Sequence, residues 1–413
     1  MKHSDVVIIG AGVIGITTAL ELQRRGHNVR VLDREGVAAQ ASAGNAGAFA
    51  LTEVEPLATP GIMRKAPKWL LDPLGPLSIP PAYALKITPW MMRFWQASRP
   101  RRYHELLAAQ AGLMRLSGAA LERLISDVDG EALIQRDGQM QLYEGEAEFR
   151  ASLPGWETRR RHGIAFELLE NREAIAELQP GLSPRFTHAG FTPGWMNTVD
   201  PKTWVGHLAQ AFLDRGGRIE QMEIRAVTPR DTSVHLSHAG GTVEADKVVV
   251  ASGAWSHELA RTLGDHIPLE TERGYNTTLP EGAFDLRMHL TFSRHGFVAS
   301  RINGGVRIGG AVELGGLKLP PNFRRADTLL QKATQFLPGL RTEGGTQWMG
   351  FRPSLPDSIP VIGPARRSRN VIYAFGHGHL GLTQSAGTAE MVADILVDNT
   401  PEISPDPFSA TRF

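Results

Sequence analysis

The chain has 413 residues, which is too long for one ordinary hydrophobic core, so we expect two or more domains. Its composition, 42% hydrophobic and 21% charged, is typical of a globular protein, and 44 basic against 43 acidic residues give no reason to expect nucleic acid as a partner. The absence of cysteine excludes disulfides, thiolate metal sites and cysteine nucleophiles, and it favours a reducing compartment.

The apolar residues 6–20 resemble a signal peptide in composition only. They carry regularly spaced glycines and no small-residue cleavage pattern, so we interpret them as core and expect a cytoplasmic protein. No uninterrupted apolar run reaches the roughly 18 to 20 residues that a membrane-spanning helix needs.

The chain begins with a predicted strand, glycine turn, helix and second strand, at residues 5–10, 10–15, 16–26 and 28–33. Gly10 permits the tight turn, Gly12 lets the backbone approach a pyrophosphate, and Gly15 lets helix and strand pack closely. Asp33 ends the second strand, where a carboxylate can accept both hydroxyls of an adenosine ribose. In this context we favour a dinucleotide site over a glycine turn without a ligand.

A small-residue loop at 41–47 follows, in which Ser42 can bond a phosphate and Asn45 a ring edge or a ribose. The alternative is a flexible surface loop. A later buried strand at 243–250 leads into a second glycine turn at Gly253, and we expect it beside the first strand. An interrupted nucleotide domain with several glycine loops fits FAD better than NAD.

Residues 51–102 are rich in proline and tryptophan, with cations such as Arg64, Lys86 and Arg93 nearby. Short helices and turns are expected here. Tryptophan beside cations indicates a bilayer-interface or quinone-binding surface at 60–95. A helical lid packed on its own domain is an equally good interpretation.

Further on, helices are predicted at 102–127, 146–161, 170–178, 201–215, 324–336 and 384–397, with strands between them. A third strand-to-helix glycine turn covers residues 376–383 and offers backbone amides to the flavin end of the same cofactor. The 14 histidines show no metal-ligand spacing, so no metal is expected.

Several stretches in matching order resemble the FAD-dependent D-amino-acid oxidase superfamily, and within it the bacterial D-amino-acid dehydrogenases. They are Val31-Leu-Asp33-Arg-Glu35, Ser42-Ala-Gly-Asn45-Ala-Gly47, Arg273-Gly-Tyr275, Arg307-Ile-Gly-Gly310, Gly350-Phe-Arg352-Pro353 and Gly376-His377-Gly378. The segments Glu272-Arg273-Gly-Tyr275 and His379-Leu-Gly-Leu-Thr383 also resemble dehydrogenases of cis-4-hydroxy-D-proline. Arg273 replaces the lysine usual in the primary-amine enzymes, which leaves the substrate open.

The resemblance implies an α/β fold: a Rossmann-like FAD-binding domain plus a mixed α+β substrate domain with a large antiparallel sheet. We assign 1–50, 196–265 and 346–413 to the FAD domain and 51–195 and 266–345 to the substrate domain, with 56–100 as a lid or a membrane- or partner-facing insert. The expected cofactor-binding residues are Gly10, Gly12, Gly15, Asp33, Arg34, Ser42, Asn45, Ala46, Gly47, Val227, Gly253, Gly350, His377, Gly378, Leu380, Gly381 and Thr383.

The candidate catalytic residues are Arg352, Tyr275, Arg273 and His379. Arg352 matches the superfamily's carboxylate arginine, because a guanidinium binds a carboxylate through two parallel bonds. Its structural alternative is a pair with Asp357. Tyr275 bonds the same carboxylate or is a core tyrosine, Arg273 adds charge or lies on a solvated face, and His379 faces the flavin or the substrate amine or is held only by backbone bonds.

The implied reaction is oxidation of the Cα–N bond of a D-amino or D-imino acid, of the D-proline or cis-4-hydroxy-D-proline type or broader, by hydride transfer to FAD. The implied partners are this substrate and a quinone or other electron acceptor. One alternative is an oxygen-using amine oxidase of the sarcosine or glycine oxidase type. Another is a non-catalytic flavoprotein subunit of an electron-transfer complex. Contact through 60–95 would place the protein on the inner face of the cell membrane.

Overall fold

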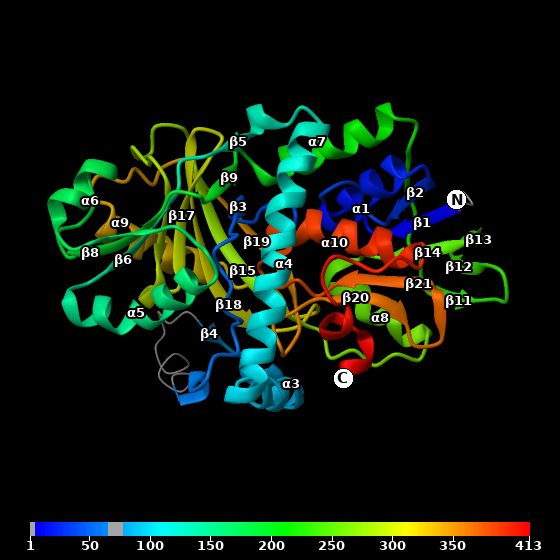
Figure 1. Cartoon of the computed structure of the whole chain (residues 1–413). Coiled ribbons are helices and arrows are strands. Elements are labelled where there is room, and N and C mark those ends of the chain that lie inside the picture. The colour runs from blue at the N-terminus through cyan, green and yellow to red at the C-terminus, as the bar shows by residue number, and fades with distance from the viewer. Residues whose placement is uncertain (1–4, 65–76) are drawn as a thin grey trace.

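The computed structural model describes residues 5–64 and 77–413. Two large sheets dominate this part of the chain and lie side by side (Figure 1). The first has six strands in the order β10 (Arg218–Gln221), β2 (Asn28–Asp33), β1 (Asp5–Ile9), β14 (Lys247–Val250), β21 (Ser368–Phe375) and β20 (Val361–Ala365). All its neighbours pair in parallel except β20 with β21. This is the predicted Rossmann-like sheet.

Alternation along the strands of the six-stranded sheet gives it two apolar faces. Val6 and Ile8 of β1 pack with α1 (Val13–Arg24), α7 (Pro201–Asp214), α10 (Gly381–Leu396) and α4 (Pro100–Asp127). Val7 and Ile9 face the small sheet β11 (Ala226–Pro229), β12 (Val234–His238) and β13 (Gly241–Ala245), together with α8 (Ser256–Thr262). The single strand predicted at 243–250 is thus divided between β13 and β14.

The second large sheet has the order β19 (Thr346–Ser354), β15 (Glu270–Leu279), β18 (Gly305–Leu314), β17 (Phe297–Ile302), β16 (His289–Phe292), β6 (Gln139–Tyr143), β8 (His188–Thr192) and β7 (Glu167–Leu169), with β4 (Leu77–Ser78) beside β18. Its pairs are antiparallel except β16 with β6 and β18 with β4. The large antiparallel sheet is confirmed. β19, which the sequence assigned to the FAD domain, pairs within this second sheet.

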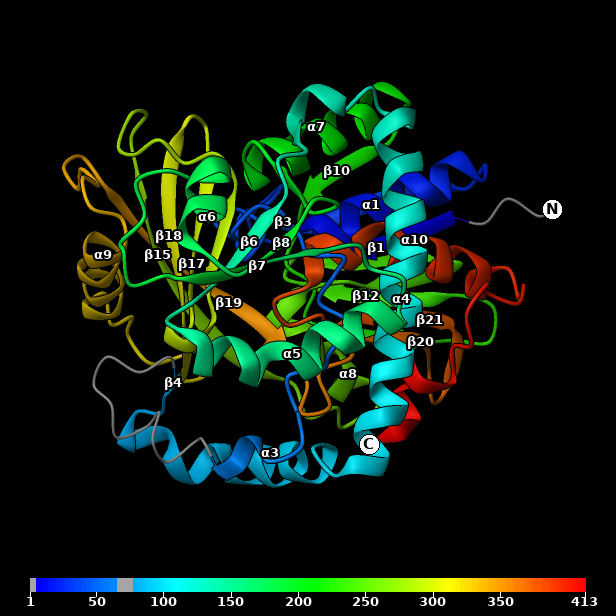
Figure 2. The ribbon, with the colours of Figure 1, turned by 60° about the vertical axis from the view of Figure 1, so that its left-hand side comes forward.

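The remaining helices are α3 (Ala84–Ala97), α5 (Glu146–Arg161), α6 (Arg172–Leu178) and α9 (Arg324–Phe336), and a short sheet joins β3 (Ala48–Phe49), β9 (Met196–Thr198) and β5 (Ile134–Gln135). The predicted helices thus form within a few residues of their expected bounds. α7 begins as its sequence predicts, because Asp200 accepts the amide of Thr203 at 2.9 Å and Pro201 occupies the first turn. α3 lies along the lower edge of the molecule (Figure 2).

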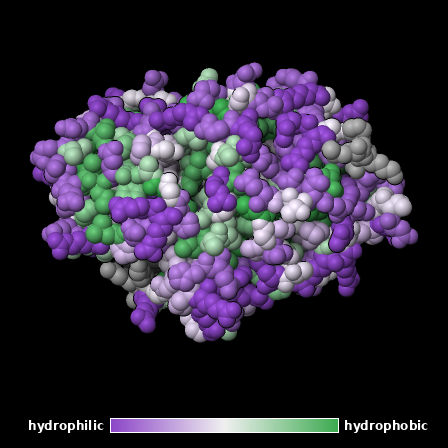
Figure 3. All heavy atoms as spheres, viewed as in Figure 1, coloured by the Kyte–Doolittle hydropathy of each residue, from purple (hydrophilic) through white to green (hydrophobic). Residues whose placement is uncertain are grey.

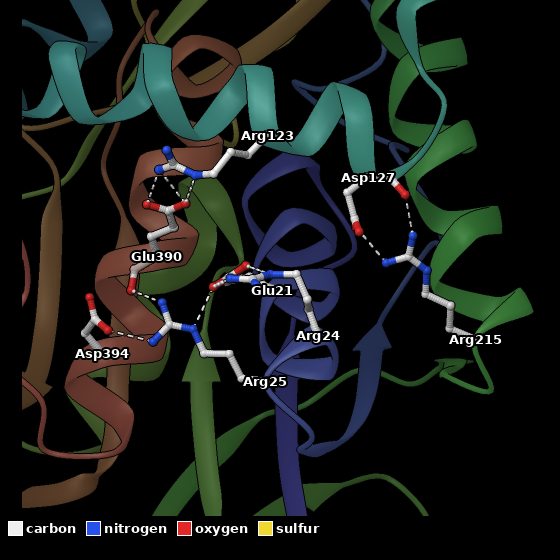
Figure 4. Close-up of polar contacts among 8 residues, drawn as sticks. All are labelled: Glu21, Arg24, Arg25, Arg123, Asp127, Arg215, Glu390 and Asp394. Atoms are coloured by element: carbon white, nitrogen blue, oxygen red, sulfur yellow. Dashed lines mark hydrogen bonds and ion pairs between the residues drawn. The ribbon is translucent and has the colours of Figure 1, made fainter.

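The long helix α4 crosses the middle of the molecule and packs on α10 (Figure 1). Ion pairs reinforce this packing (Figure 4): Arg123 of α4 binds Glu390 of α10 at 2.8 Å, and Arg25 beyond α1 binds Asp394 of α10 at 2.6 Å. Arg215 fixes the end of α7 to the end of α4 through Asp127 at 2.7 Å. Partly exposed pairs contribute little each, so the apolar contacts beneath them carry most of the stability.

Candidate active site

A cavity of about 780 Å³ lies between the two large sheets. The first βαβ unit, the loop at 41–47 and the turn at 376–382 line one part of it, and β15, β18 and β19 line the other. Its volume falls within the roughly 300 to 1,000 Å³ typical of ligand sites. Most of the candidate residues line this cavity: Gly10, Gly12, Asp33, Arg34, Ser42, Asn45, Ala46, Gly253, Tyr275, Gly350, Arg352, His377, Gly378, His379 and Gly381.

A side chain would collide with the backbone at two glycines of the first turn and would be crowded at the third. A Cβ at Gly10 would overlap the carbonyl of Ala251, and one at Gly15 would overlap the carbonyl of Gly10. Gly15 therefore does not line the cavity but lets α1 approach β1 closely. A Cβ at Gly12 would stand 3.2 Å from Ser42 Oγ, at the start of α1. This is the geometry that a pyrophosphate needs at a helix N-terminus.

Asp33 stands at the end of β2 and closes the loop that follows it. Its Oδ2 accepts the amide of Ala11 at 2.8 Å, and its Oδ1 accepts the amides of Glu35 and Gly36 at 2.8 Å each. The carboxylate is thereby fixed at the cavity wall with further lone pairs for a ligand's hydroxyls. Arg34 next to it lies over the ring of Trp255 at 3.7 Å.

The loop at 41–47 is tied to both parts of the cavity. Ser42 Oγ accepts the amide of Val13 at 3.0 Å, which holds the loop against the start of α1. From the other side, Asn276 donates to the carbonyl of Gly44 at 2.7 Å, and Arg307 donates to that of Asn45 at 2.6 Å. A surface loop would not have these contacts, so this segment is part of the cavity wall.

The turn at 376–383 presents buried polar groups at the start of α10. His377 bonds Thr388 Oγ1 through Nε2 at 2.9 Å, and burial lowers its pKa to about 3. Gly378 has φ of 55°, which favours glycine, and donates its amide to the carbonyl of Pro353 at 2.8 Å. Thr383 does not line the cavity, but its hydroxyl accepts the amide of Ala50 at 2.9 Å and so holds the next wall segment.

Three other expected cofactor residues lie behind the wall. Gly47 accepts the amide of Thr198 at 2.7 Å, and Leu380 is buried at the start of α10. Val227 is fully buried in β11, where its amide donates to Thr262 Oγ1 at 3.1 Å. The cavity lining includes the nearby residues Ile224 and Arg225 but not Val227.

Arg352 of β19 reaches the cavity with its guanidinium lying over the backbone of Gly274 on β15, where any Cβ would overlap it. Its Nη1 donates to the carbonyl of Ala311 at 3.1 Å. Burial lowers the pKa of Arg352, and the charge of Glu272, which stands opposite it on β15, acts in the other direction. No carboxylate in the described part of the chain lies within 4.0 Å of the guanidinium. An arginine remains protonated, so this charge faces the cavity without a close counter-ion.

The alternative pairing of Arg352 with Asp357 is not found. Asp357 instead binds Arg412 at 2.7 Å and approaches Arg102 at 3.7 Å. The acidic neighbour of Arg352 is therefore Glu272, a buried residue whose pKa is raised by burial and lowered by Arg352.

The side chain of His379 is accessible from the cavity, and the rest of its surroundings are protein. Burial and, secondarily, the charge of Arg352 lower its pKa to about 4, while Glu53 opposes the shift. The ring is thus neutral at physiological pH and can donate through one nitrogen and accept through the other.

Arg273 does not line the cavity, and the hydroxyl of Tyr275, which does line it, is engaged within the protein. Arg273 is fully buried and binds Glu313 at 3.1 Å, and it also donates to the carbonyls of Gly316, Leu319 and Pro320. Tyr275 donates its hydroxyl to Glu313 at 2.9 Å and accepts the amide of Asn322 at 3.0 Å. The structure therefore does not bring these two polar groups to Arg352.

Sequence reasoning missed several polar residues of the cavity wall: Glu53, Gln141, Arg159, Glu272, Asn276, His289 and Arg307. Asn276 Oδ1 is buried without a hydrogen-bond partner among the described residues. Trp348 was also missed, although its ring lies against Gly44 and Gly350 and requires a glycine at both. Only Arg307 and Glu272 lie in stretches that resemble the superfamily. The other residues lie in segments whose sequence carries no recognisable motif.

A family model described as FAD dependent oxidoreductase matches residues 5–395. The chain belongs to this family. The residues present fit its cofactor: a glycine turn at a helix N-terminus, a fixed carboxylate at the end of β2, and an unpartnered acceptor, Asn276 Oδ1, facing the same cavity. This FAD-dependent oxidoreductase is an enzyme of the predicted class, and the predicted cofactor is confirmed.

Two relatives match this oxidoreductase over 99% of its length. It is 35% identical to a D-amino-acid oxidase of Bradyrhizobium diazoefficiens, of which the match covers 98%, and 31% identical to a D-amino acid dehydrogenase of Sinorhizobium medicae, of which it covers 99%. The structure of glycine oxidase from Geobacillus kaustophilus superposes with a TM-score of 0.80 at 21% identity, covering both chains completely. This last likeness confirms the fold.

Within residues 5–64 and 77–413, no helix combines the length and apolar character needed to cross a membrane. In the same residues, no three histidine or acidic side chains gather closely enough to hold a metal ion.

Proposed function

We propose that this enzyme oxidises the Cα–N bond of a D-amino or D-imino acid, of the D-proline or cis-4-hydroxy-D-proline type or more broadly, to the imine. The observation that carries the proposal is Arg352. The guanidinium is protonated, lies in a ligand-sized cavity, and has one hydrogen bond to the described residues and no ion pair with them within 4.0 Å, so it is suited to a carboxylate ligand. The names of the two relatives support the D-amino acid class.

The chain's own residues supply position and electrostatics. Arg352 binds the substrate carboxylate through two parallel bonds, and its contacts with Gly274 and the carbonyl of Ala311 fix its direction. Neutral His379 lines the same cavity and can accept a hydrogen bond from the substrate without adding a charge to the site. Bound FAD supplies the acceptor for the hydride of Cα. Water then hydrolyses an open-chain imine.

The cofactor is held by the residues that line the other part of the cavity. Gly12 and the start of α1 bind the pyrophosphate, Asp33 the ribose, and the turn at His377–Gly378 the flavin end. Arg273 and Tyr275 have a positioning role in this proposal, because their contacts with Glu313 hold β15 to β18.

Anaerobic mixing of the purified protein with D- and L-amino acids, D-proline, cis-4-hydroxy-D-proline and sarcosine tests the proposal. We expect D-amino or D-imino acids to bleach the flavin absorbance faster than their L-enantiomers. Bleaching by none of these compounds would refute the proposal and favour a non-catalytic flavoprotein subunit. Preference for sarcosine would favour the amine oxidase alternative.

The electron acceptor is a quinone or another carrier in this proposal. A dehydrogenase activity is distinguished from an oxidase activity by mixing the reduced enzyme with air-saturated buffer or with a soluble quinone. We expect faster reoxidation by the quinone; faster reoxidation by oxygen would make the enzyme an oxidase.

We further propose that α3 docks on an anionic bilayer. Three large apolar side chains of α3 are exposed: Leu85 at 90%, Met92 at 57% and Trp95 at 49%. Hydrophilic residues, by contrast, cover most of the molecular face that Figure 3 shows. Residues 56–104 contain eight lysines and arginines against one aspartate, whereas the chain as a whole is nearly neutral. Apolar groups beside cations suit an anionic interface. Part of the predicted contact region, 65–76 with Trp69, lies outside the described residues.

Flotation with vesicles tests this contact. We expect more protein on vesicles with anionic lipid than on purely zwitterionic ones, and loss of binding in the double variant Met92→Ser, Trp95→Ser. Trp90 is unsuitable for this test because it is buried and stacks on Phe94 at 5.4 Å. Replacing Leu213, an exposed leucine on α7, by serine is the matched control. Equal flotation of the double variant and the parent would refute the docking.

A further inference from the structure

A second group of polar side chains, Glu53, Arg159 and His379, lines the same cavity as Arg352. Glu53 follows β3, Arg159 lies in the last turn of α5, and His379 precedes α10. The oxidation proposed above needs neither Glu53 nor Arg159. These residues come from segments far apart in the sequence and line one cavity, so a separate role for them has to be explained.

Arg159 and Glu53 form a fixed pair. The side chain of Arg159 is 10% exposed and packs over the ring of Trp156 at 4.8 Å, and its Nη2 donates to Glu53 Oε1 at 3.2 Å. Gln110 holds the backbone of Glu53 by donating to its carbonyl at 2.7 Å. A buried arginine with a fixed carboxylate is not a solvated surface pair, so the direction of the Glu53 carboxylate is defined by the fold.

One oxygen of Glu53 remains available. Its Oε2 has no hydrogen bond to any residue in the described part of the chain, and the side chain is 33% exposed beside the cavity. A carboxylate oxygen is an acceptor only, so a ligand atom that meets it must be a donor. An apolar ligand group at the same place would remove this oxygen from water without replacing its hydrogen bond.

His379 lines the same cavity as both charged groups. The charges of Arg352 and Glu53 shift the pKa of His379 in opposite directions. The cavity lining thus combines a cation that suits a carboxylate, a neutral ring and an acceptor. A ligand that spans it carries a carboxylate at one end and a donor at the other.

We infer that Glu53, held by Arg159, forms a distal subsite that selects substrates with a hydroxyl or amino group on the side chain or ring. This inference rests on the proposed function and narrows its substrate class to polar D-amino or D-imino acids. Glu53 is a specificity-determining residue in this account, and Arg159 positions it.

Two pairs of compounds test the subsite on the flavin-loaded enzyme: cis-4-hydroxy-D-proline against D-proline, and D-lysine against D-norleucine. Each pair differs only in the distal donor. We expect the wild type to favour the donor-bearing member by about tenfold or more in kcat/KM in at least one pair, and Glu53→Ala to bring that ratio close to one. Glu53→Gln can still accept from Arg159, and we expect it to lower the preference for D-lysine, because the amide carries no charge.

Glu55→Gln is the matched control. Glu55 lies two residues away in the same segment, accepts the hydroxyl of Tyr103 at 2.6 Å and does not line the cavity, so both ratios should remain those of the wild type. Flavin content and bleaching by the donor-free compounds show whether each variant is folded. Wild-type ratios near one, or a ratio that Glu53→Ala and Glu53→Gln leave unchanged, would overturn the subsite alone. No bleaching by any of the four compounds would overturn the proposed function and the subsite with it.

Discussion

The guanidinium of Arg352 lies against the backbone of Gly274, in the space that the Cβ of any other residue would fill. The two residues stand on neighbouring strands, with Gly350 of β19 directly opposite Gly274 of β15. A glycine in the middle of a strand usually weakens it, so its presence here marks a close approach. Gly274 gives Arg352 its direction into the cavity.

Replacing Gly274 by alanine should therefore displace Arg352 while leaving the cofactor bound. We expect a rise in KM for carboxylate substrates of about tenfold or more, with flavin content unchanged, because one misplaced charged hydrogen bond costs about 1.5 to 3 kcal/mol. Steady-state kinetics and the ratio of flavin to protein check this. Gly206→Ala in α7, where a Cβ meets nothing, is the control. Unchanged KM in Gly274→Ala would contradict the positioning role.

Replacing Asp33 by alanine should weaken FAD binding. Asp33 fixes the loop after β2 through the amides of Ala11, Glu35 and Gly36, and in our account it also accepts the ribose hydroxyls. We expect the Kd for FAD to rise by about tenfold or more, measured by quenching of flavin fluorescence. Asp246→Ala, just before β14, removes a carboxylate that does not line the cavity and should leave the Kd unchanged. An Asp33→Ala protein with wild-type affinity would refute this role.

The buried histidines predict how stability depends on pH. Burial lowers the pKa of His377 and of His289 to about 3, whereas both rise to their ordinary value near 6.5 on unfolding. Between about pH 3 and 6.5 the unfolded state therefore binds more protons, so the free energy of unfolding falls as the pH falls through this window. Above about pH 7 these two residues add no pH dependence.

His377→Gln tests this linkage, because glutamine can still bond Thr388 but does not titrate in this range. We expect the slope of Tm against pH between 6.5 and 4.5 to be shallower in the variant than in the wild type. The absolute Tm of the variant does not enter the comparison. Parallel slopes would show that His377 is not held neutral by burial.

The sequence predicted much of the fold because its local signals agree with the tertiary structure. The glycine turn and Asp33 define the first βαβ unit, and the aspartate cap with Pro201 defines the start of α7. Single segments with strong periodicity, such as α4, could be placed to within two residues.

The site could be predicted only in part, because strand faces and distant contacts carry no local signal. Arg273, Gly274 and Tyr275 form one motif, but the register between Arg273 and Tyr275 is irregular, and both side chains bind Glu313 instead of a group in the cavity. Glu53 and Arg159 are 106 positions apart and meet only in the folded chain. Neither the residue types nor their spacing in the sequence predicts that Glu53 and Arg159 form an ion pair.

Arg352 is the central residue of this account, and the most direct measurement is the anaerobic rate of flavin reduction in the wild type and in Arg352→Met. D-Proline and cis-4-hydroxy-D-proline should saturate the wild type, and the variant should lose at least about a hundredfold in the second-order rate constant, because two charged hydrogen bonds to the substrate carboxylate disappear. Flavin content should remain that of the wild type. Equal rates of reduction in the two proteins would contradict the account, because the substrate carboxylate would then be bound elsewhere or not at all.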